Sequence, residues 1–255
     1  MHSPQVSLVV RKALSFMDVT AIVYAGGVLF VAYLVRGMIG FGSGLIAVPL
    51  LALRFPLPVV VPLVASLDYI GSASQGIKNR EHIAWRDQLP LIPFMLLGVG
   101  AGLFLLKAVK TAVLSKVLGG FIIVYAMYQL LPAVPLQASR IAAIAWGFLG
   151  GAVGALFGTG GPFYVIYFNL RRLEKSVFRA TFALNYLIDG AIRLIAYAIM
   201  GLWQWDTLLA LLSALPVAAV GLYVGGRVHT GCSPTTFVRL VSLLLLSSGL
   251  ALLLK

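Results

Sequence analysis

Long apolar runs alternate with short polar connections along almost the whole chain. Runs of this length predict membrane-spanning helices, because about 20 apolar residues cross the hydrocarbon core of a bilayer. The first half of the chain has four such runs, at residues 18–35, 57–77, 89–106 and 112–131. The second half has four more, at residues 141–157, 177–200, 208–224 and 237–254. The pattern therefore predicts an all-α integral membrane protein.

In each half, a glycine-rich break follows the first run and leads into a short apolar piece. The breaks lie at residues 36–44 and 158–162, and the pieces after them at 45–53 and 163–170. A helix as short as the first piece is about 14 Å long at 1.5 Å per residue, and this cannot cross ~30 Å of hydrocarbon. Each break is therefore expected inside the membrane, as the tip of a re-entrant hairpin near the midplane.

The two halves are related in sequence. Phe41-Gly-Ser-Gly44 matches Phe157-Gly-Thr-Gly160, and Ser66-Leu-Asp-Tyr-Ile70 matches Ala183-Leu-Asn-Tyr-Leu187 in the same order. The sequence thus predicts a polytopic helix bundle of two repeats, each with one broken helix or re-entrant hairpin and three transmembrane helices. Three crossings is an odd number, so the second repeat is expected to be inverted. The expected division is an N-terminal cytoplasmic segment at 1–17, a first membrane repeat at 18–131, a connecting loop at 132–140 and a second membrane repeat at 141–255.

Composition agrees with this pattern, since 61% of the residues are hydrophobic and only 10% are charged. Soluble domains are about 45–50% apolar and 25% charged, so an ordinary cytosolic enzyme and intrinsic disorder are both excluded. By number alone, the apolar residues would form about eight spanning helices. Eight full crossings therefore stays the alternative to six crossings with two hairpins.

The net charge of +12 comes from 19 Lys and Arg against 7 Asp and Glu. The basic residues lie in short loops on both expected faces, which fits the positive-inside bias and contact with anionic lipid headgroups. A positively biased pore for anions is the alternative explanation for part of this charge. No nucleic-acid motif accompanies it, so the expected partners are the lipid bilayer and a small anion rather than nucleic acid.

The sequence offers little for catalysis, a metal or a cofactor. Cys232 is the one cysteine, and the three histidines, at positions 2, 82 and 229, are isolated outside the apolar runs. No HExxH, paired CxxC or Walker lysine motif is present. We therefore expect no enzyme activity, no metal site and no cofactor.

The two breaks have the chemistry of an anion site. The first N–H groups of each short helix lack intrahelical partners and carry partial positive charge, which favours anions. Ser43 and Thr159 occupy matching positions, where their hydroxyls could cap the helices or donate to the anion. Packing between helices is the alternative explanation of the glycines, and it is the one favoured for Gly147, Gly150 and Gly151. The residues expected to bind substrate at the tips are Gly42, Ser43, Gly44, Gly158, Thr159, Gly160 and Gly161.

Ionisable residues inside the apolar runs are candidates for function, because their burial in a membrane is costly. Asp189 and Arg193 are four residues apart and share one helix face, so they form either a structural ion pair or an anion ligand with its partner. Arg36, next to the first break, is a second candidate cation unless it extends to the membrane interface. Asp68, whose repeat counterpart is Asn185, either caps the first tip or carries a coupling proton. The candidate ligands are thus Arg36, Asn185 and Arg193, and the candidate proton carriers are Asp68 and Asp189.

Two long segments carry a family resemblance. They are Gly37-Met-Ile-Gly-Phe-Gly-Ser-Gly-Leu-Ile-Ala-Val-Pro49 and Gly147-Phe-Leu-Gly-Gly-Ala-Val-Gly-Ala-Leu-Phe-Gly-Thr-Gly-Gly-Pro162. With these two signatures, one in each half, the chain resembles the sulfite exporter TauE/SafE family over nearly its whole length. The resemblance implies a small bundle of two related halves that moves sulfite, sulfonates or other small organic anions across the bacterial inner membrane. Ser43 departs from the run of glycines that many members carry at this point.

The resulting hypothesis is a secondary transporter for a small sulfur-containing or organic anion, with alternating access around a midplane site. An intramembrane enzyme and a non-transporting assembly or sensor subunit are the alternatives. The sequence leaves open the direction of transport, the coupling ion (proton or sodium) and whether the protein is a homo-oligomer.

Overall fold

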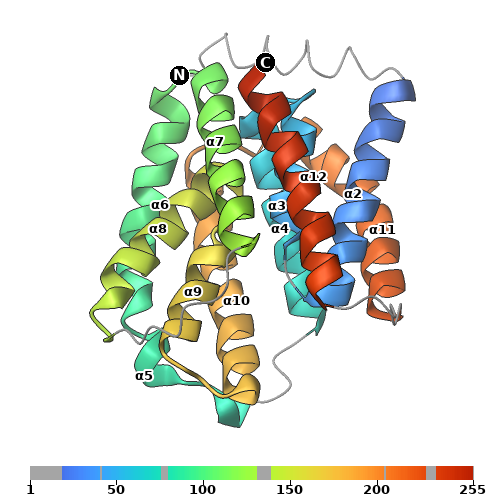
Figure 1. Cartoon of the computed structure of the whole chain (residues 1–255). Helices are drawn as coiled ribbons and strands as arrows, with labels where there is room; N and C mark the ends of the chain where they lie inside the picture. Colours follow the sequence, from blue (N-terminus) through green and yellow to red (C-terminus); the bar gives the residue numbers. More distant parts are fainter. Residues whose placement is uncertain are drawn as a thin grey trace.

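The computed structural model describes residues 19–40, 42–75, 80–130, 139–203, 205–227 and 234–254. The predicted N-terminal segment 1–17 and most of the connecting loop lie outside these residues. Within the described ranges, every regular element is helical, and the helices form one bundle (Figure 1). The apolar runs predicted from the sequence each correspond to a helix in this bundle.

The first half contains five main helices, with short 3₁₀ and α segments between the third and fourth. They are α2 (Val19–Ile39), α3 (Ser43–Ala52), α4 (Leu57–Gln75), η1 (Arg80–His82), α5 (Trp85–Gln88), α6 (Leu91–Ala108) and α7 (Thr111–Leu130). The second half repeats the order as α8 (Ala142–Phe157), α9 (Gly161–Leu170), α10 (Lys175–Ile199), α11 (Trp205–Arg227) and α12 (Pro234–Leu254).

Five helices among the described residues are long and apolar enough to cross a membrane. They are Val19–Met38, Trp85–Ala108, Thr111–Leu130, Ser176–Ile199 and Thr207–Arg227. The short helices α3 and α9 are each 10 residues long, slightly longer than the pieces predicted at 45–53 and 163–170, because each begins two residues earlier. The helices before them differ, because α2 has the length of a full span whereas α8 has only 16 residues. The chain is therefore a helical membrane protein with two broken helices of unequal first arms.

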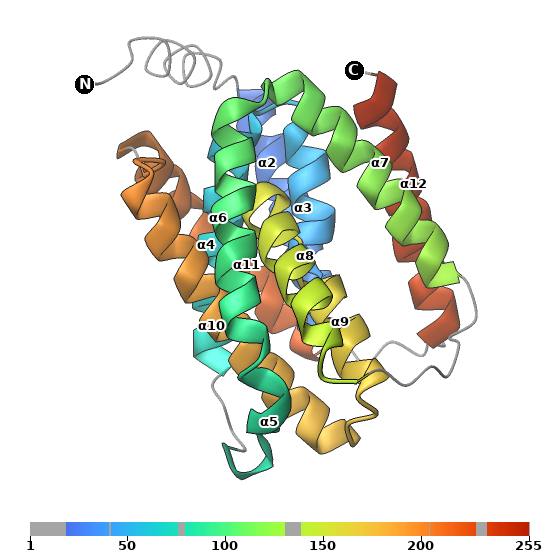
Figure 2. The ribbon, with the colours of Figure 1, turned by 90° about the vertical axis from the view of Figure 1, so that its left-hand side faces the viewer.

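The helices pack in pairs that join the two halves. Helix α6 lies along α8, α2 lies along α11, and α7 lies along α12 (Figures 1 and 2). Glycines allow the close approach: a Cβ added at Gly98 on α6 would collide with the carbonyl oxygen of Phe148 on α8. A Cβ at Gly225 on α11 would likewise collide with the carbonyl oxygen of Leu34 on α2.

The glycines of α8 pack as the sequence analysis favoured. A Cβ at Gly147 would lie 3.0 Å from the carbonyl oxygen of Leu91, and one at Gly151 would collide with the backbone of Met95. A Cβ at Gly150 would collide with the ring of Tyr164. These three positions therefore serve contact between helices.

Helix α3 lies at the centre of the bundle. Nine of its ten residues are buried, from Ser43 to Ala52 with Leu50 as the exception. Such a helix has no lipid-facing side, which is why it can be short and apolar throughout. The fold thus places α3 inside protein rather than against lipid, whereas α9 buries five of its ten residues: Gly161, Pro162, Tyr164, Tyr167 and Phe168.

Candidate anion site at the two broken helices

The two breaks touch each other in the interior of the bundle. A Cβ added at Gly44, in the first turn of α3, would collide with the carbonyl oxygen of Gly158 in the second break. Val48 lies against the other side of Gly158, 3.3 Å from the place of a Cβ. Gly42 (φ 97°) and Gly158 (φ 67°) both take left-handed backbone conformations that suit glycine. The glycines of the breaks therefore form the sharp turns and permit the contact between the tips.

Neither short helix has a side-chain cap at its start. The N-cap positions of α3 and α9 are Gly42 and Gly160, and no side chain accepts a hydrogen bond from the N–H groups there. The hydroxyl of Ser43 instead donates to Oδ1 of Asp68 over 2.6 Å. Since no side chain caps either helix start, the N–H groups left free there carry the partial positive charge that favours an anion. At the start of α9, Pro162 has no N–H group and the N–H of Phe163 donates to the carbonyl oxygen of Gly160.

The first break is held by a buried ion pair. Nη1 of Arg36 lies 2.6 Å from Oδ1 of Asp68, and the side chains are 2% and 1% exposed. The same Nη1 donates to Ser43 Oγ over 3.1 Å. Tyr33 donates its hydroxyl proton to Oδ1 of Asp68 over 2.6 Å, and Nη2 of Arg36 donates to Ser72 Oγ. Arg36 therefore lies in the protein interior rather than at a membrane interface.

The second break has its own ion pair. Nη2 of Arg193 lies 2.8 Å from Oδ2 of Asp189, one turn earlier on α10. Asp189 also accepts a hydrogen bond from Tyr164 of α9 over 2.9 Å. Nη1 of Arg193 donates to the carbonyl oxygen of Gly154 in the last turn of α8. The pair that the sequence suggested is thus formed, and it is placed directly beside the second break.

Tyr186 on α10 connects the two breaks. Its hydroxyl donates to Oδ2 of Asp68 over 3.4 Å, and its ring lies 5.4 Å from the guanidinium carbon of Arg36. A Cβ added at Gly161, the first residue of α9, would lie 3.5 Å from the ring edge of Tyr186. One side chain therefore contacts the Arg36–Asp68 pair at the first break and the helix start at the second.

Several buried polar side-chain atoms, some of them at the breaks, have no hydrogen-bond partner in the part of the chain that the structure describes. Ordinarily more than about 90% of buried polar groups are paired. The unpartnered side-chain donors are Nε of Arg36, Nε of Arg193, the hydroxyl of Thr159, the hydroxyl of Tyr167 and Nδ2 of Asn185. Four of these five belong to residues that the sequence predicted to bind substrate.

Asn185 faces a different neighbour from its repeat counterpart. Nε2 of Gln88, at the end of α5, donates to Oδ1 of Asn185 over 3.0 Å. Oε1 of Gln88 and Nδ2 of Asn185 are both buried and unpartnered. The Gln88–Asn185 pair therefore has one unpartnered donor and one unpartnered acceptor among the described residues, at the place where α10 contacts the end of α5.

The site includes residues that the sequence analysis did not single out. Tyr33, Tyr164 and Tyr186 contact the carboxylates of the two ion pairs, and Gln88 contacts Asn185. A signal existed for Tyr186, because it lies in the repeated segment Ala183–Leu187 and corresponds to Tyr69. The two tyrosines each reach toward the other half, since Tyr69 packs against Gly190 of α10.

Within the described ranges, no group of three or more His, Cys, Asp or Glu side chains is placed to hold a metal ion. The donors around the breaks are guanidinium, hydroxyl, amide and backbone N–H groups, which bind oxyanions rather than cations.

Comparison with known proteins identifies the family. The model of the family "Sulfite exporter TauE/SafE" matches residues 25–252. A probable inner membrane transporter protein, TsaS, from Comamonas testosteroni is 28% identical over 198 residues, which cover 74% of this chain and 81% of that protein. A probable sulfite/organosulfonate exporter, TauE, from Cupriavidus necator is 24% identical over 223 residues, which cover 84% of this chain and 87% of that protein. No solved structure gives a significant match.

These matches agree with the apolar helices in describing a multi-pass protein of the bacterial inner membrane. The family consists of transporters and not of enzymes. The chain belongs to the sulfite exporter TauE/SafE family of membrane transporters.

Proposed function

We propose that this protein is a secondary transporter that moves sulfite or an organosulfonate by alternating access. The site would lie where the two breaks meet, between α3 and α9. The observation that carries this proposal is the set of buried donors without acceptors at Arg36, Thr159 and Arg193. An oxyanion offers acceptor oxygens of the kind that these donors lack.

The substrate class rests on the relatives. One is named a probable sulfite/organosulfonate exporter, and sulfite and sulfonates share a compact group of oxygens bearing negative charge. Two helix starts without side-chain caps would face such a group. Each oxygen could then accept from a backbone N–H, a hydroxyl or a guanidinium.

The two ion pairs suggest how transport could be coupled. While Asp68 and Asp189 are ionised, each neutralises the arginine beside it. A proton on either carboxylate would leave the adjacent guanidinium with a net positive charge, and the anion would supply the missing countercharge. Proton and anion would then bind together, because a lone buried charge is costly.

Alternating access requires two units that move against each other. If the repeats 18–131 and 141–255 correspond in chain order, α2 corresponds to α8 and α6 to α11. Under this correspondence, the contact between α6 and α8 is the counterpart of the contact between α11 and α2. An inverted repeat would produce two equivalent contacts of this kind. Rocking of the two close pairs about the central short helices would then open the site to one side at a time.

Flux measurements test the proposal. Purified protein in liposomes is expected to move radiolabelled sulfite or methanesulfonate, and a pH gradient is expected to drive accumulation. A sodium gradient at constant pH serves as the comparison, since sodium is the other candidate coupling ion. If neither anion moves under any pH or sodium gradient, the proposed function is wrong.

A further inference from the structure

We propose that an anionic phospholipid binds to one end of the bundle, with its headgroup beside Arg54 and Lys116 and one acyl chain in a crevice between α2, α4 and α11. This site is separate from the breaks between the helices, and the inference does not depend on the proposed transport function.

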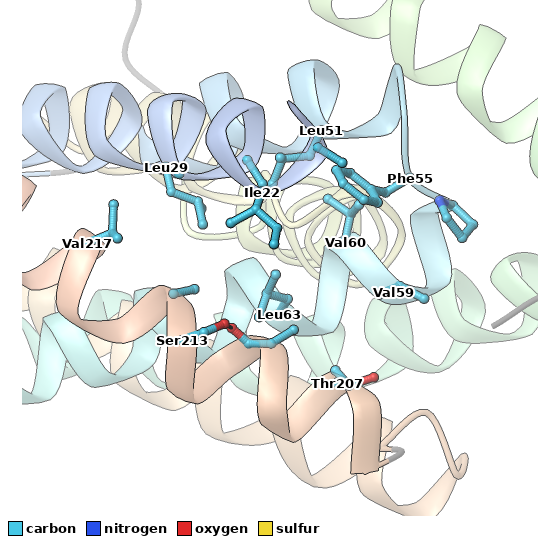
Figure 3. A pocket seen from close by; sticks show the side chains of 16 residues that line it. Ile22, Leu29, Leu51, Phe55, Val59, Val60, Leu63, Thr207, Ser213 and Val217 are labelled. Atoms are coloured by element: carbon cyan, nitrogen blue, oxygen red, sulfur yellow. Dashed lines mark hydrogen bonds between the residues drawn. The ribbon is translucent and has the colours of Figure 1, made fainter. Parts of the chain in front are cut away.

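The crevice is apolar and open at the side of the bundle. It has a volume of about 190 Å³ and is lined by α2, the end of α3, α4 and α11 (Figure 3). Leu29, Leu51 and Leu63 extend into it from three different helices. Its lining includes the hydroxyl side chains of Thr207 and Ser213 but no charged side chain. A small anion gains nothing from such a lining, whereas an alkyl chain buries apolar surface there.

The crevice exists because α2 and α11 diverge. At one end the two helices are in contact, since a Cβ at Gly221 would lie 2.7 Å from the carbonyl oxygen of Phe30. At the other end, a Cβ added at Gly26 would meet nothing within 4 Å. The part of α2 that lines the crevice, from Ala21 to Leu29, is about 12 Å long at 1.5 Å per residue. The opening is therefore wedge-shaped and long enough to hold part of an acyl chain.

A second cavity adjoins the crevice and has basic and hydroxyl side chains among its apolar lining residues. Its volume is about 310 Å³, and its lining includes Arg54, Thr111, Ser115 and Lys116. Phe55 and Pro56 line both cavities. The guanidinium of Arg54 is steadied over the ring of Tyr24, 5.6 Å from its centroid. Two cations and two hydroxyl side chains at this place suit a phosphate group.

The arrangement of the two cavities selects a phospholipid over a free anion. The basic cavity lies where α3 ends and α7 begins, and we expect the lipid headgroups at this level because helix ends lie near the membrane surface. The apolar crevice continues from it along α2, into the hydrocarbon region. None of the described acidic side chains lines either cavity. An anionic headgroup joined to an acyl chain fills both, whereas inorganic phosphate fills only the first.

Native mass spectrometry of the full-length protein tests this inference. The protein is expected to retain phosphatidylglycerol severalfold more strongly than phosphatidylcholine of the same chain length. Arg54→Gln and Lys116→Gln are each expected to weaken phosphatidylglycerol binding about fivefold, because one basic residue near the headgroup contributes about that much. Lys110→Gln is the matched control, since Lys110 is exposed beside the same turn but lines neither cavity.

The chain-binding part has its own pair of variants. Gly26→Leu fills the crevice without a backbone collision and is expected to reduce phosphatidylglycerol binding, whereas its neighbour Gly27→Leu lies outside the lining and is expected to leave binding unchanged. Equal retention of the two lipids, or unchanged binding after Arg54→Gln and Lys116→Gln, overturns the inference. A loss in these two variants with no effect of Gly26→Leu also overturns it, and assigns the basic cavity to a free phosphate-like anion. Thermal melting curves check that each variant is folded.

Discussion

The guanidinium of Arg36 on α2 and the carboxylate of Asp68 on α4 lie 2.6 Å apart, and both are shielded from solvent. The pair ties the helix before the first break to the helix after α3. Both members also form hydrogen bonds with the hydroxyl of Ser43, the residue at which α3 begins. The carboxylate of Asp68 therefore holds both Arg36 and the first residue of α3.

Asp68→Asn is expected to destabilise the protein and stop transport. An amide cannot balance the charge of Arg36, and breaking a buried pair in this way costs about 3–5 kcal/mol. Thermal melting in detergent and sulfite flux in liposomes measure the two effects.

The double variant Arg36→Met with Asp68→Leu is the control for Asp68→Asn. Replacing both partners of a buried ion pair by apolar groups is often neutral for stability. We expect the double variant to melt near the wild-type temperature and yet to move no anion. A double variant that transports normally would mean that the pair serves only the fold.

Thr159→Val is expected to separate binding from stability. The hydroxyl of Thr159 is buried and has no partner in the described residues, so the nearly isosteric valine should leave the melting temperature unchanged or raise it. If the hydroxyl donates to the anion, its loss removes a hydrogen bond to a charged group, about 1.5–3 kcal/mol. The KM for sulfite should then rise about tenfold or more. An unchanged KM, measured beside Thr159→Ser as control, would remove this residue from the site.

Tyr186→Phe is expected to change transport more than stability. The hydrogen bond from Tyr186 to Asp68 is long, at 3.4 Å, and such a bond contributes about 0.5–1.5 kcal/mol to folding at most. Because the hydroxyl donates to Asp68, its loss should alter the pH dependence of uptake, whereas the ring contacts with Arg36 and Gly161 remain. Tyr69→Phe is the matched control, since Tyr69 holds the corresponding place in the first repeat. Identical pH profiles for wild type and Tyr186→Phe would contradict a coupling role.

Gly44→Ala tests the contact between the tips. The added methyl group would collide with the carbonyl oxygen of Gly158, and overpacking of this kind costs about 1–3 kcal/mol. We expect a lower melting temperature and reduced flux. Gly100→Ala is the control, because a Cβ at Gly100 meets nothing within 4 Å. If both alanine variants behave alike, the close contact at Gly44 has no special importance.

The helices could be predicted from the sequence because hydropathy alone determines where a chain can lie in a bilayer. The apolar runs at 57–77 and 177–200 correspond to α4 and α10, and the breaks occur at the predicted glycines. The full length of α2 was not foreseen. Its helix continues past Val35 to Ile39, since Arg36 is satisfied inside the protein and does not end the helix.

The site could be predicted only in part. The Asp189–Arg193 pair follows from helical spacing, because residues four apart share a face. The Arg36–Asp68 pair does not, since its members are 32 residues apart on different helices and meet only through tertiary packing. Asn185, the repeat counterpart of Asp68, was expected to bind substrate, and its side-chain oxygen accepts a hydrogen bond from Gln88. Sequence symmetry therefore identified buried polar positions without giving their partners.

Direct location of a bound anion tests the central claim most sharply. Selenite is a close analogue of sulfite, and its selenium atom can be located by anomalous scattering in crystals of the full-length protein. The account predicts a selenium peak between the two breaks, with the selenite oxygens within hydrogen-bond distance of the Thr159 hydroxyl and of Nε of Arg193 or Arg36. A selenium peak elsewhere in the protein, with the breaks empty, would contradict it.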